Sequence, residues 1–343
     1  MSRKLLYFNL AVDETDTSLG FAVKWIETIA KKYDHVDVVS LKKVSNPVFS
    51  QSIKIYGPEP SKRKLRKYIY LFKKVKELCK ENDYERCFSH MSPISVVVSS
   101  ILLQKNNIKT TLWFTHPGPK FGIKKLILFL SFLFAEHIVT ASTSSFPIKS
   151  KKVHVIGHAI DLVKFENNKK SYNLNNFLIL SRISSSKKLE IAIDGFLNSN
   201  FKNHSLDIIG GTLNSNDREY FEKLKKKYSQ PNINFLGKVD HKKLPEVLKK
   251  YDVHFNSARN GFYDKSVLET LSSEIINFYV NDDFDLLFGN DYYKFANSSD
   301  LSEKLNKLED LKNYQIKNLF SNTKLSLNAN SLNSLLYRLE PYL

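Results

Sequence analysis

Two cations frame a serine-rich turn in the segment NFLILSRISSSKKLEIAIDGF, residues 176–196. Arg182 follows an apolar run typical of a buried strand, and Lys187 precedes a helical pattern. A turn from strand to helix gathers backbone N–H groups at the positive end of the helix, which attracts anions. Cations placed there can neutralise a diphosphate and stabilise it as a leaving group. The plainer interpretation makes both side chains solvated charges and the intervening serines, Ser184–Ser186, an N-cap.

Glycines mark two further turns that can approach a ligand closely. Gly210 and Gly211 directly follow a strand-like run in DIIGGTLNSND, where the lack of a side chain leaves the backbone accessible. Gly20, in DETDTSLGFAVKW, stands at the start of the first long helical pattern. It belongs either to an ordinary loop before a helix or to a small-residue loop over a ligand. No GxGxxG fingerprint of dinucleotide binding occurs in the chain.

A carboxylate stands inside an apolar helical pattern in the segment GFYDKSVLETLSSEIINF, residues 261–278. The pattern places Glu269 on the inward side of the helix, after a glycine turn and the pair Asp264 and Lys265. Because burying an uncompensated charge is costly, a carboxylate at such a position needs a reason beyond packing.

Histidines and acidic residues supply the other candidates. His90, His116 and His158 each end a strand-like run, although a lone histidine is more often a structural residue. The DDFD stretch at 282–285 contains a DxD pattern, but hard cations need several oxygen ligands that converge from separate segments. We therefore interpret it as a solvated loop and expect no required metal ion.

Short apolar runs alternate with longer helical patterns along the whole chain, which predicts an α/β fold with parallel sheets covered on both faces. Strands are expected at residues 4–11, 35–41, 86–91, 109–116, 137–142, 152–158, 176–182, 204–211, 232–239, 253–258 and 276–282. Helices are expected between them, for example at 20–33, 187–199 and 217–228.

A polar, turn-rich stretch at 161–176 separates two series of these elements. We expect two doubly wound domains, residues 1–165 and 166–325, and a C-terminal helix at 326–343 that packs back toward the first domain. Folds of this kind bind ligands beyond the carboxyl ends of their strands, so we expect the binding site in a cleft that the two domains face.

Length and composition are consistent with two packed domains in a reducing compartment. The 343 residues are 42% hydrophobic, which is enough to form real cores. Cys79 and Cys87 have no His or Cys cluster beside them, which argues against a disulfide framework or structural zinc. The N-terminus lacks a signal-peptide cleavage site, and the apolar run at 126–135 is too short to span a bilayer. We expect a cytoplasmic location, with room for peripheral contact on the inner face of the membrane.

The formal net charge of +17 favours an anionic partner: a phosphorylated substrate, anionic lipid or nucleic acid. Residues 61–80 contain nine Lys or Arg against one acidic residue, and residues 123–135 pair lysines with a broad apolar face. Both segments suit an anionic membrane surface, where each cation adds about 1 kcal/mol. The alternative is a buried helix at 123–135 beside a solvated one. Nucleic acid is the weaker expectation, because no recognisable nucleic-acid motif accompanies the charge.

Together these segments resemble a retaining glycosyltransferase of family four, which has the GT-B fold. The resembling pieces occur in the order SLGF, FSHMSP, LWFTH, KKVHVIGHAIDLVKF, LSRISSSKK, DIIGG, NINFLGKVDHKKLPEVLKKYDVHFNSA and DKSVLE. They cover essentially the whole chain and are densest from 137 to 275. The match is closest to prokaryotic members with an Asp-Lys pair before the glutamate, and it makes the first domain the acceptor side and the second the nucleotide-sugar side.

The resemblance implies roles for particular residues. Arg182 and Lys187 would hold the donor diphosphate and His116 would face the donor sugar, and these three form the expected catalytic set. Glu269, the second glutamate of the E-x7-E motif, would bond the ribose. The other expected donor-binding residues are Gly20, Gly210, Gly211, Gly261, Phe262, Asp264, Lys265 and Leu268.

Two positions depart from the family pattern. Gly261 stands where the first glutamate of the motif usually approaches the transferred sugar, although Asp264 can supply a nearby carboxylate. Glu274 stands where a glycine is expected after the motif, so that turn needs a different construction.

The expected function is transfer of a sugar from a nucleoside-diphosphate-sugar donor to a glycan, lipid-linked or other acceptor. The resemblance implies retention of the anomeric configuration, without a cofactor or a required metal. Two alternatives stay open. One is a catalytically weakened GT-B subunit that binds a partner, and the other is a basic protein that binds nucleic acid or a membrane surface.

Overall fold

A computed structural model describes residues 2–13, 20–42, 49, 52–59, 64–167, 169, 171–289, 293–311, 315, 316, 320 and 323–343 of the chain. Most of the loop before Gly20 and the first three residues of the basic segment 61–80 lie outside this description. The chain divides into two compact units. The first contains Met1–Ala159 and Leu332–Leu343, and the second contains Ile160–Ser331.

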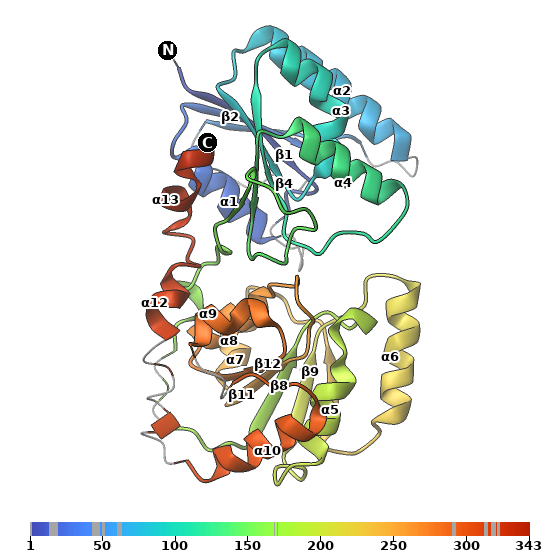
Figure 1. Ribbon diagram of the computed structural model, residues 1–343, viewed down its shortest axis with the longest axis vertical. Coiled ribbons are helices and arrows are strands. Elements are labelled where there is room, and N and C mark those ends of the chain that lie inside the picture. Colours follow the sequence, from blue (N-terminus) through green and yellow to red (C-terminus); the bar gives the residue numbers. More distant parts are fainter. Residues whose placement is uncertain are drawn as a thin grey trace. The chain divides into compact units, whose positions relative to one another are not determined.

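The first unit is built on a seven-stranded parallel sheet with the order β3-β2-β1-β4-β5-β6-β7 (Figure 1). From β1 the chain runs outward to β3 and then builds β4 to β7 on the other side, which is the doubly wound topology. The strands are β1 Lys4–Asn9, β2 His35–Ser40, β3 Ile53–Tyr56, β4 Arg86–His90, β5 Lys109–Trp113, β6 His137–Thr140 and β7 Val153–Val155.

Helices α2, α3 and α4 lie side by side on one face of this sheet, and α1 lies on the other (Figure 1). Their bounds are α1 Phe21–Ala30, α2 Lys64–Glu81, α3 Pro93–Lys105 and α4 Ile123–Phe134. The chain ends in α13 Leu335–Leu339 and the 3-10 turn η4 Glu340–Tyr342. Tyr342 stacks on His154 with ring centroids 4.3 Å apart, and Thr111 donates a hydrogen bond to its carbonyl. The last residues of the chain are therefore part of the first unit.

The second unit contains a five-stranded parallel sheet with the order β10-β9-β8-β11-β12. Its strands are β8 Asn176–Leu180, β9 Ser205–Ile209, β10 Ile233–Gly237, β11 Val253–Asn256 and β12 Ile276–Tyr279. Its helices are α5 Leu189–Leu197, α6 Ser215–Lys227, α7 Leu244–Leu248, α8 Lys265–Ser272, α9 Asp285–Phe288, α10 Ser298–Glu309 and α12 Thr323–Asn328, with 3-10 turns η1 Val163–Phe165, η2 Ser185–Lys187 and η3 Asp282–Phe284. The chain again winds outward from one strand, β8, in both directions.

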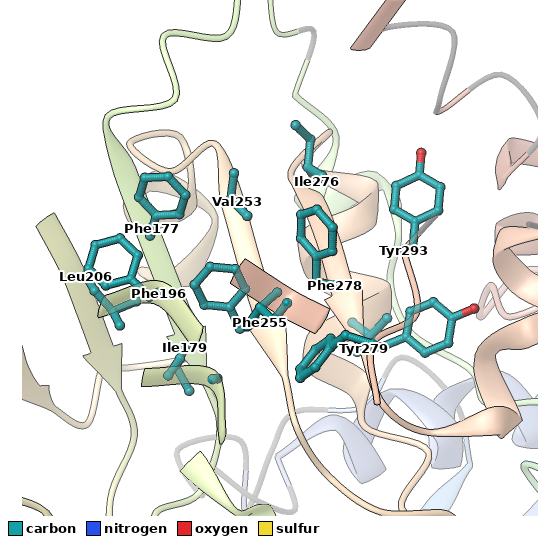
Figure 2. Packing of buried hydrophobic residues seen from close by; sticks show 14 of the residues in the cluster. Phe177, Ile179, Phe196, Leu206, Val253, Phe255, Ile276, Phe278, Tyr279 and Tyr293 are labelled. Carbon is teal, nitrogen blue, oxygen red and sulfur yellow. The ribbon is translucent and has the colours of Figure 1, made fainter. Parts of the chain in front are cut away.

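Aromatic side chains fill the core beside the second sheet (Figure 2). Phe177, Phe255 and Phe278 come from neighbouring strands, and each is at most 1% exposed. Ring centroids lie 5.9 Å apart for Phe177 and Phe255 and 6.3 Å apart for Phe255 and Phe278, within the range of favourable aromatic contact. This layer gives the loops at the strand ends a tightly packed base.

The predicted α/β class with two doubly wound parallel sheets is confirmed. Every predicted strand is present, but each ends earlier than its apolar run because the chain turns into a loop at the carboxyl end of the sheet. Strand β3 was not predicted. It has only four residues, IKIY, of which one is a lysine, and at the edge of the sheet so short a segment gives little apolar signal. Among the described residues, no helix combines the length and apolar character needed to cross a membrane.

Candidate functional site

The turn after β8 departs from the predicted strand-turn-helix. A 3-10 turn ending at Lys187 comes first, Lys188 then adopts a left-handed conformation with φ 48°, and α5 begins only at Leu189. The helical pattern predicts a start near Lys187. The helix begins later because the left-handed backbone at Lys188 breaks the helical conformation after Lys187. Lys187 therefore belongs to the loop at the end of β8.

The start of α5 is not capped by the serines of the turn. Ser184 Oγ and Ser186 Oγ bond each other at 2.8 Å, and neither η2 nor α5 has a side-chain cap. Instead, the N–H of Leu189 donates to Tyr220 Oη at 3.1 Å, and Tyr220 donates to Glu190 at 2.6 Å. The N-cap interpretation of the serines is therefore wrong. The expectation of free N–H groups at this helix start is also wrong for Leu189, because the hydroxyl of Tyr220 on α6 accepts its hydrogen bond.

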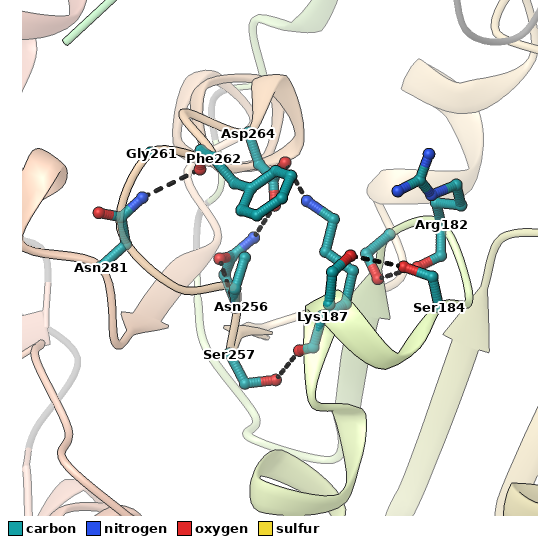
Figure 3. A network of polar contacts seen from close by, with 12 residues as sticks. Arg182, Ser184, Lys187, Asn256, Ser257, Gly261, Phe262, Asp264 and Asn281 are labelled. Atoms are coloured by element: carbon teal, nitrogen blue, oxygen red, sulfur yellow. Dashed lines mark hydrogen bonds and ion pairs between the residues drawn. The ribbon is translucent and has the colours of Figure 1, made fainter. Parts of the chain in front are cut away.

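Lys187 is a buried cation held in a network of contacts (Figure 3). The residue is 6% exposed, its ammonium pairs with Asp264, and it lies 4.7 Å from the centroid of the Phe262 ring. Asn256 Nδ2 donates to the second oxygen of Asp264 at 3.0 Å, and Ser257 Oγ donates to the Lys187 carbonyl at 2.8 Å. A buried ion pair needs such additional hydrogen bonds to offset its desolvation. The network therefore fixes the ammonium in one place.

Two exposed cations stand in loops that follow strands of the second sheet. Arg182 pairs with no carboxylate among the described residues, and its guanidinium makes none of the contacts drawn in Figure 3. Lys238 covers Gly211: a Cβ at Gly211 would meet Lys238 Cγ at 2.5 Å. The N–H of Ile183 donates to the Gly211 carbonyl at 3.0 Å. Arg182 follows β8 and Lys238 follows β10, the strands on either side of β9. Lys238 gives no sequence signal, because a single lysine after a strand is ordinary.

Gly210 is required by the packing of the strand ends. It has φ 155°, and a Cβ there would lie 1.8 Å from the carbonyl oxygen of Ser181. Its N–H donates to the Gly237 carbonyl at 2.9 Å. The backbone of Ser181 thus occupies the space that the missing side chain of Gly210 leaves. That a ligand also lies close to Gly210 stays a prediction.

Asn281 and the DDFD segment that follows it hold the loop that carries Gly261 and Phe262. The N–H of Gly261 donates to Asp283 Oδ2 at 2.8 Å, and Asn281 Nδ2 donates to the Phe262 carbonyl at 3.0 Å. Gly261 has φ 90°, a conformation that favours glycine. The DDFD segment is not a loop, since it forms η3 and the start of α9, but Asp282 and Asp285 are solvated as expected, with side chains 60% and 45% exposed. It is a scaffold, since its carboxylate accepts the one donor that Gly261 offers.

Glu269 lies on α8, is 5% exposed, and has partners that its own segment does not reveal. His241 Nε2 lies 3.0 Å from Glu269 Oε1, and Lys164 Nζ donates to the His241 carbonyl at 2.9 Å. Burial by itself would raise the pKa of Glu269. The hydrogen bond from His241 and the charges of Lys265 and Lys164 outweigh burial and hold that pKa below its ordinary value. The carboxylate is therefore ionised at neutral pH.

Leu268 and Glu274, which flank Glu269 in this segment, make contacts that support the fold. Leu268 is fully buried in the core of the second unit. Glu274 adopts the left-handed conformation, φ 54°, that a glycine would take at this position. Its carboxylate accepts a hydrogen bond from the N–H of Lys169 at 2.7 Å, and its carbonyl accepts one from Tyr172 at 2.9 Å. These bonds offset the roughly 1–2 kcal/mol that a left-handed residue other than glycine costs.

Gly20 and His116 belong to the first unit. Gly20 directly precedes α1, and residues 14–19 of its loop lie outside the described residues. His116 follows β5 and is exposed. Its N–H donates to the Ser145 carbonyl at 2.8 Å, and its ring lies edge-on to Phe114 with centroids 6.1 Å apart. The backbone is thus fixed while the imidazole stays accessible.

The other two strand-end histidines are packed in an aromatic cluster. His90 is 0% exposed and His158 is 3% exposed. His90 lies 5.0 Å from Trp25, His158 lies 5.7 Å from Trp113, and the two indole rings are 4.7 Å apart, all between ring centroids. Both histidines therefore serve the core of the first unit.

The predicted site residues are divided between the two units. Gly20 and His116 are in the first, and the second contains Arg182, Lys187, Gly210, Gly211, Gly261, Phe262, Asp264, Lys265, Leu268 and Glu269. Within the second unit, Lys187, Phe262 and Asp264 are in direct contact. The part of the chain that the structure describes contains no group of three or more His, Cys, Asp or Glu side chains arranged to hold a metal ion.

The sequence matches no protein-family model and no curated protein. Its structure is similar to that of Anabaena Alr3699/HepE in complex with UDP and glucose, with a TM-score of 0.76 and 14% identity over 99% of this chain and 98% of that one. Sucrose-phosphate synthase from Thermosynechococcus elongatus gives a TM-score of 0.77 and 14% identity over 99% and 97%. The lipopolysaccharide outer core galactosyltransferase WaaB, in its apo form, gives 0.64 and 11% over 97% and 99%. The chain therefore has the GT-B fold that the resemblance implies.

Proposed function

We propose that this chain is a glycosyltransferase that moves a sugar from a nucleoside-diphosphate-sugar donor to an acceptor hydroxyl, with retention of anomeric configuration. The observation that carries the proposal is the buried ammonium of Lys187, fixed by Asp264 and Phe262 at the carboxyl end of β8. Exposed Arg182 stands on the same turn. A pre-placed cation in a partly dry site attracts phosphate far more strongly than one in water.

The two cations act on the leaving group. As the bond between the sugar C1 and the donor phosphate oxygen breaks, the diphosphate leaves with the electron pair, and Arg182 and Lys187 stabilise its added charge. The acceptor oxygen forms the new bond to C1 on the same face, and its proton passes to the departing phosphate oxygen. No protein base is needed in this scheme, so none is assigned.

Glu269 suits a ribose. It is ionised, and His241 engages only Oε1, so Oε2 has no partner among the residues that the structure describes. An ionised carboxylate is a strong acceptor for hydroxyl donors, and a ribose offers two of them on adjacent carbons. His241 and Lys164 act as positioning residues in this proposal, because they hold the carboxylate in place.

The remaining parts of the proposal concern the acceptor side and the surroundings. His116, with its exposed imidazole, would face the donor sugar, and Gly20 would border the donor. We place the chain with the retaining enzymes of family four, assign it no cofactor or required metal, and expect a glycan or lipid-linked acceptor. We expect a cytoplasmic protein with peripheral membrane contact through 61–80 and 123–135, and no role for nucleic acid.

The first donor to test is a uridine diphosphate sugar, since the similar HepE structure holds UDP and glucose. A thermal-shift screen with UDP, GDP and other nucleoside diphosphates should raise the melting temperature for one base, because a ligand that binds only the folded state stabilises it. Arg182→Ala should abolish that shift. Absence of a shift with every nucleotide, or a shift unchanged by Arg182→Ala, rejects the proposed site. NMR of the product anomer then tests retention.

A second candidate function is supported by Gly261. It stands where the family places its first glutamate, and its N–H is already bonded to Asp283, so this position offers the sugar no carboxylate. The chain would then be a GT-B subunit that binds a nucleotide sugar without turning it over. Binding without transfer or donor hydrolysis, for every nucleotide sugar that shifts the melting temperature, would favour this candidate over the enzyme.

A further inference from the structure

Helix α4 presents apolar side chains to solvent. Of its residues Ile123–Phe134, only Leu128 and Ser131 are buried. The exposed large apolar side chains in and beside the helix are Phe121 at 83%, Ile123 at 67%, Leu126 at 50%, Phe129 at 47%, Leu133 at 50% and Phe134 at 36%. Single exposed apolar residues are ordinary, but a contiguous group marks an interaction surface. The alternative of a buried helix at 123–135 is therefore wrong.

Lysines border these side chains without a visible role in folding. Lys120, Lys124 and Lys125 are exposed, and none of the described carboxylates pairs with them. They stand at the start of α4, where the helix already carries partial positive charge, so they weaken the helix slightly. We call these lysines and the exposed apolar residues of 121–134 the α4 surface.

The stretch of sequence around the α4 surface carries one sign of charge. No Asp or Glu occurs between Glu85 and Glu136, a stretch that contains both α3 and α4. Soluble surfaces normally mix both signs. On α2, which lies on the same face of the sheet, Leu65 and Ile69 are also 68% and 47% exposed (Figure 1). Cations beside an uncovered apolar face complement a layer of anionic headgroups above acyl chains, and a protein partner would need no such uniform charge.

We propose that the α4 surface binds an anionic lipid bilayer, with α4 lying in the plane of the membrane interface. Leu126, Phe129 and Leu133 are spaced three and four residues apart, so they share one face that enters the acyl boundary. Lys124 and Lys125 extend their ammonium groups to the headgroup phosphates. At 12 residues, α4 is shorter than the roughly 20 that a spanning helix requires, so it lies on the bilayer.

This docking rests on the peripheral membrane contact proposed above and specifies its surface. It does not depend on the proposed glycosyl transfer and is measured without a sugar donor, so failure of one leaves the other standing. If both hold, the unit that carries His116 is brought to the surface where lipid-linked acceptors are found.

The test is flotation of the full chain with vesicles of phosphatidylcholine alone and of phosphatidylcholine mixed with phosphatidylglycerol. Two double variants probe the surface: Lys124→Gln with Lys125→Gln, and Leu126→Ser with Phe129→Ser. The matched control is Leu286→Ser, which removes a leucine that is 91% exposed in the second unit. Circular dichroism and melting temperatures confirm that each variant folds, as expected for exposed positions.

The wild-type chain and Leu286→Ser should float with the anionic vesicles and not with phosphatidylcholine alone. The lysine variant should partition roughly 30-fold more weakly, because two cations are lost. The apolar variant should lose binding to the anionic vesicles. Failure of the wild type to float, or flotation unchanged in both α4 variants, overturns the proposal. So does a dimer that the apolar variant converts to a monomer in a chain that binds no vesicles, because a second copy then covers the surface.

Discussion

Helices α8 and α4 depart from the usual distribution of side chains in opposite directions. Helix α8 buries a carboxylate, Glu269, and α4 exposes leucines and phenylalanines. In α8 the departure is compensated within the protein, because His241 bonds the carboxylate and the charges of Lys265 and Lys164 favour its ionised form. In α4 nothing in the described part of the chain covers the apolar face. A buried carboxylate with partners inside the protein is typical of a site that is already formed. An exposed apolar face with no cover indicates a binding partner outside the chain.

The sharpest contrast comes from the same substitution on each helix. Leu268→Ala removes a fully buried side chain from the core beneath α8 and should cost about 2–5 kcal/mol of the free energy of unfolding. Leu126→Ala removes a half-exposed side chain from α4 and should change that free energy by less than about 0.5 kcal/mol. Urea unfolding of both variants measures the difference. Equal losses would mean that α4 is packed as tightly as α8, which would remove the contrast.

Removing Lys187 tests whether the buried cation that pairs with Asp264 at the start of α8 serves a ligand. Lys187→Ala should lower turnover of the donor roughly 100- to 1000-fold, because one preorganised stabiliser of the leaving group is lost. Lys188→Ala is the matched control, since Lys188 is the exposed neighbour on the same turn. If both variants keep wild-type turnover in a transfer assay, Lys187 is only a structural partner of Asp264.

The packing beneath α8 predicts a dependence of stability on pH. Burial lowers the pKa of His254 on β11 to about 4, against an ordinary value of 6.5. Its Nδ1 lies 2.6 Å from Oδ1 of Asn277 on β12 and 3.3 Å from Oγ1 of Thr270 on α8. As the pH falls, the histidine of the unfolded chain is protonated before the buried His254 of the folded chain. The contribution of neutral His254 to the free energy of unfolding is therefore complete above pH 6.5 and is lost as the pH falls toward 4. The loss should approach about 3 kcal/mol. Melting temperatures across this range should fall less for His254→Gln than for the wild type, and parallel curves would contradict the assignment.

The smallest of these effects concerns Glu269. Glu269→Gln keeps the shape but removes the charge, so nucleotide affinity should fall about tenfold, the value of a hydrogen bond to a charged group. Calorimetric titration measures it, with Glu246→Gln as a control at an exposed, lysine-paired glutamate. The lowered pKa of Glu269 also adds stability above pH 4.5 that is lost at lower pH, and the variant should lack this loss. Unchanged affinity in the variant would leave the carboxylate a purely structural role.

The strands and the charged turn residues were predictable because their signals are local. An apolar run such as NFLIL of β8 identifies a buried strand wherever it occurs, and Arg182 follows directly at its end. The inward position of Glu269 follows from helical spacing. The delayed start of α5 was not predictable, because it depends on the left-handed conformation of Lys188 and on a hydroxyl from α6.

The partners of the candidate site could not be predicted from the sequence. His241 lies 28 positions from Glu269, and Asp264 lies 77 positions from Lys187. Asp283, which looks like part of a solvated loop, bonds Gly261 from 22 positions away. Ordinary residues at such separations gain a role only when the strands and loops that carry them are brought together.

The sequence by itself determined the α/β class, the order of the elements, and the residue types at the turns and on the inward side of α8. Periodicity carries this information because it records which side chains must be removed from water. The tertiary structure alone decided which group faces each buried charge, and that the apolar run of α4 stays exposed. Pairing and burial depend on what lies opposite a side chain in space, and a one-dimensional pattern does not contain that neighbour.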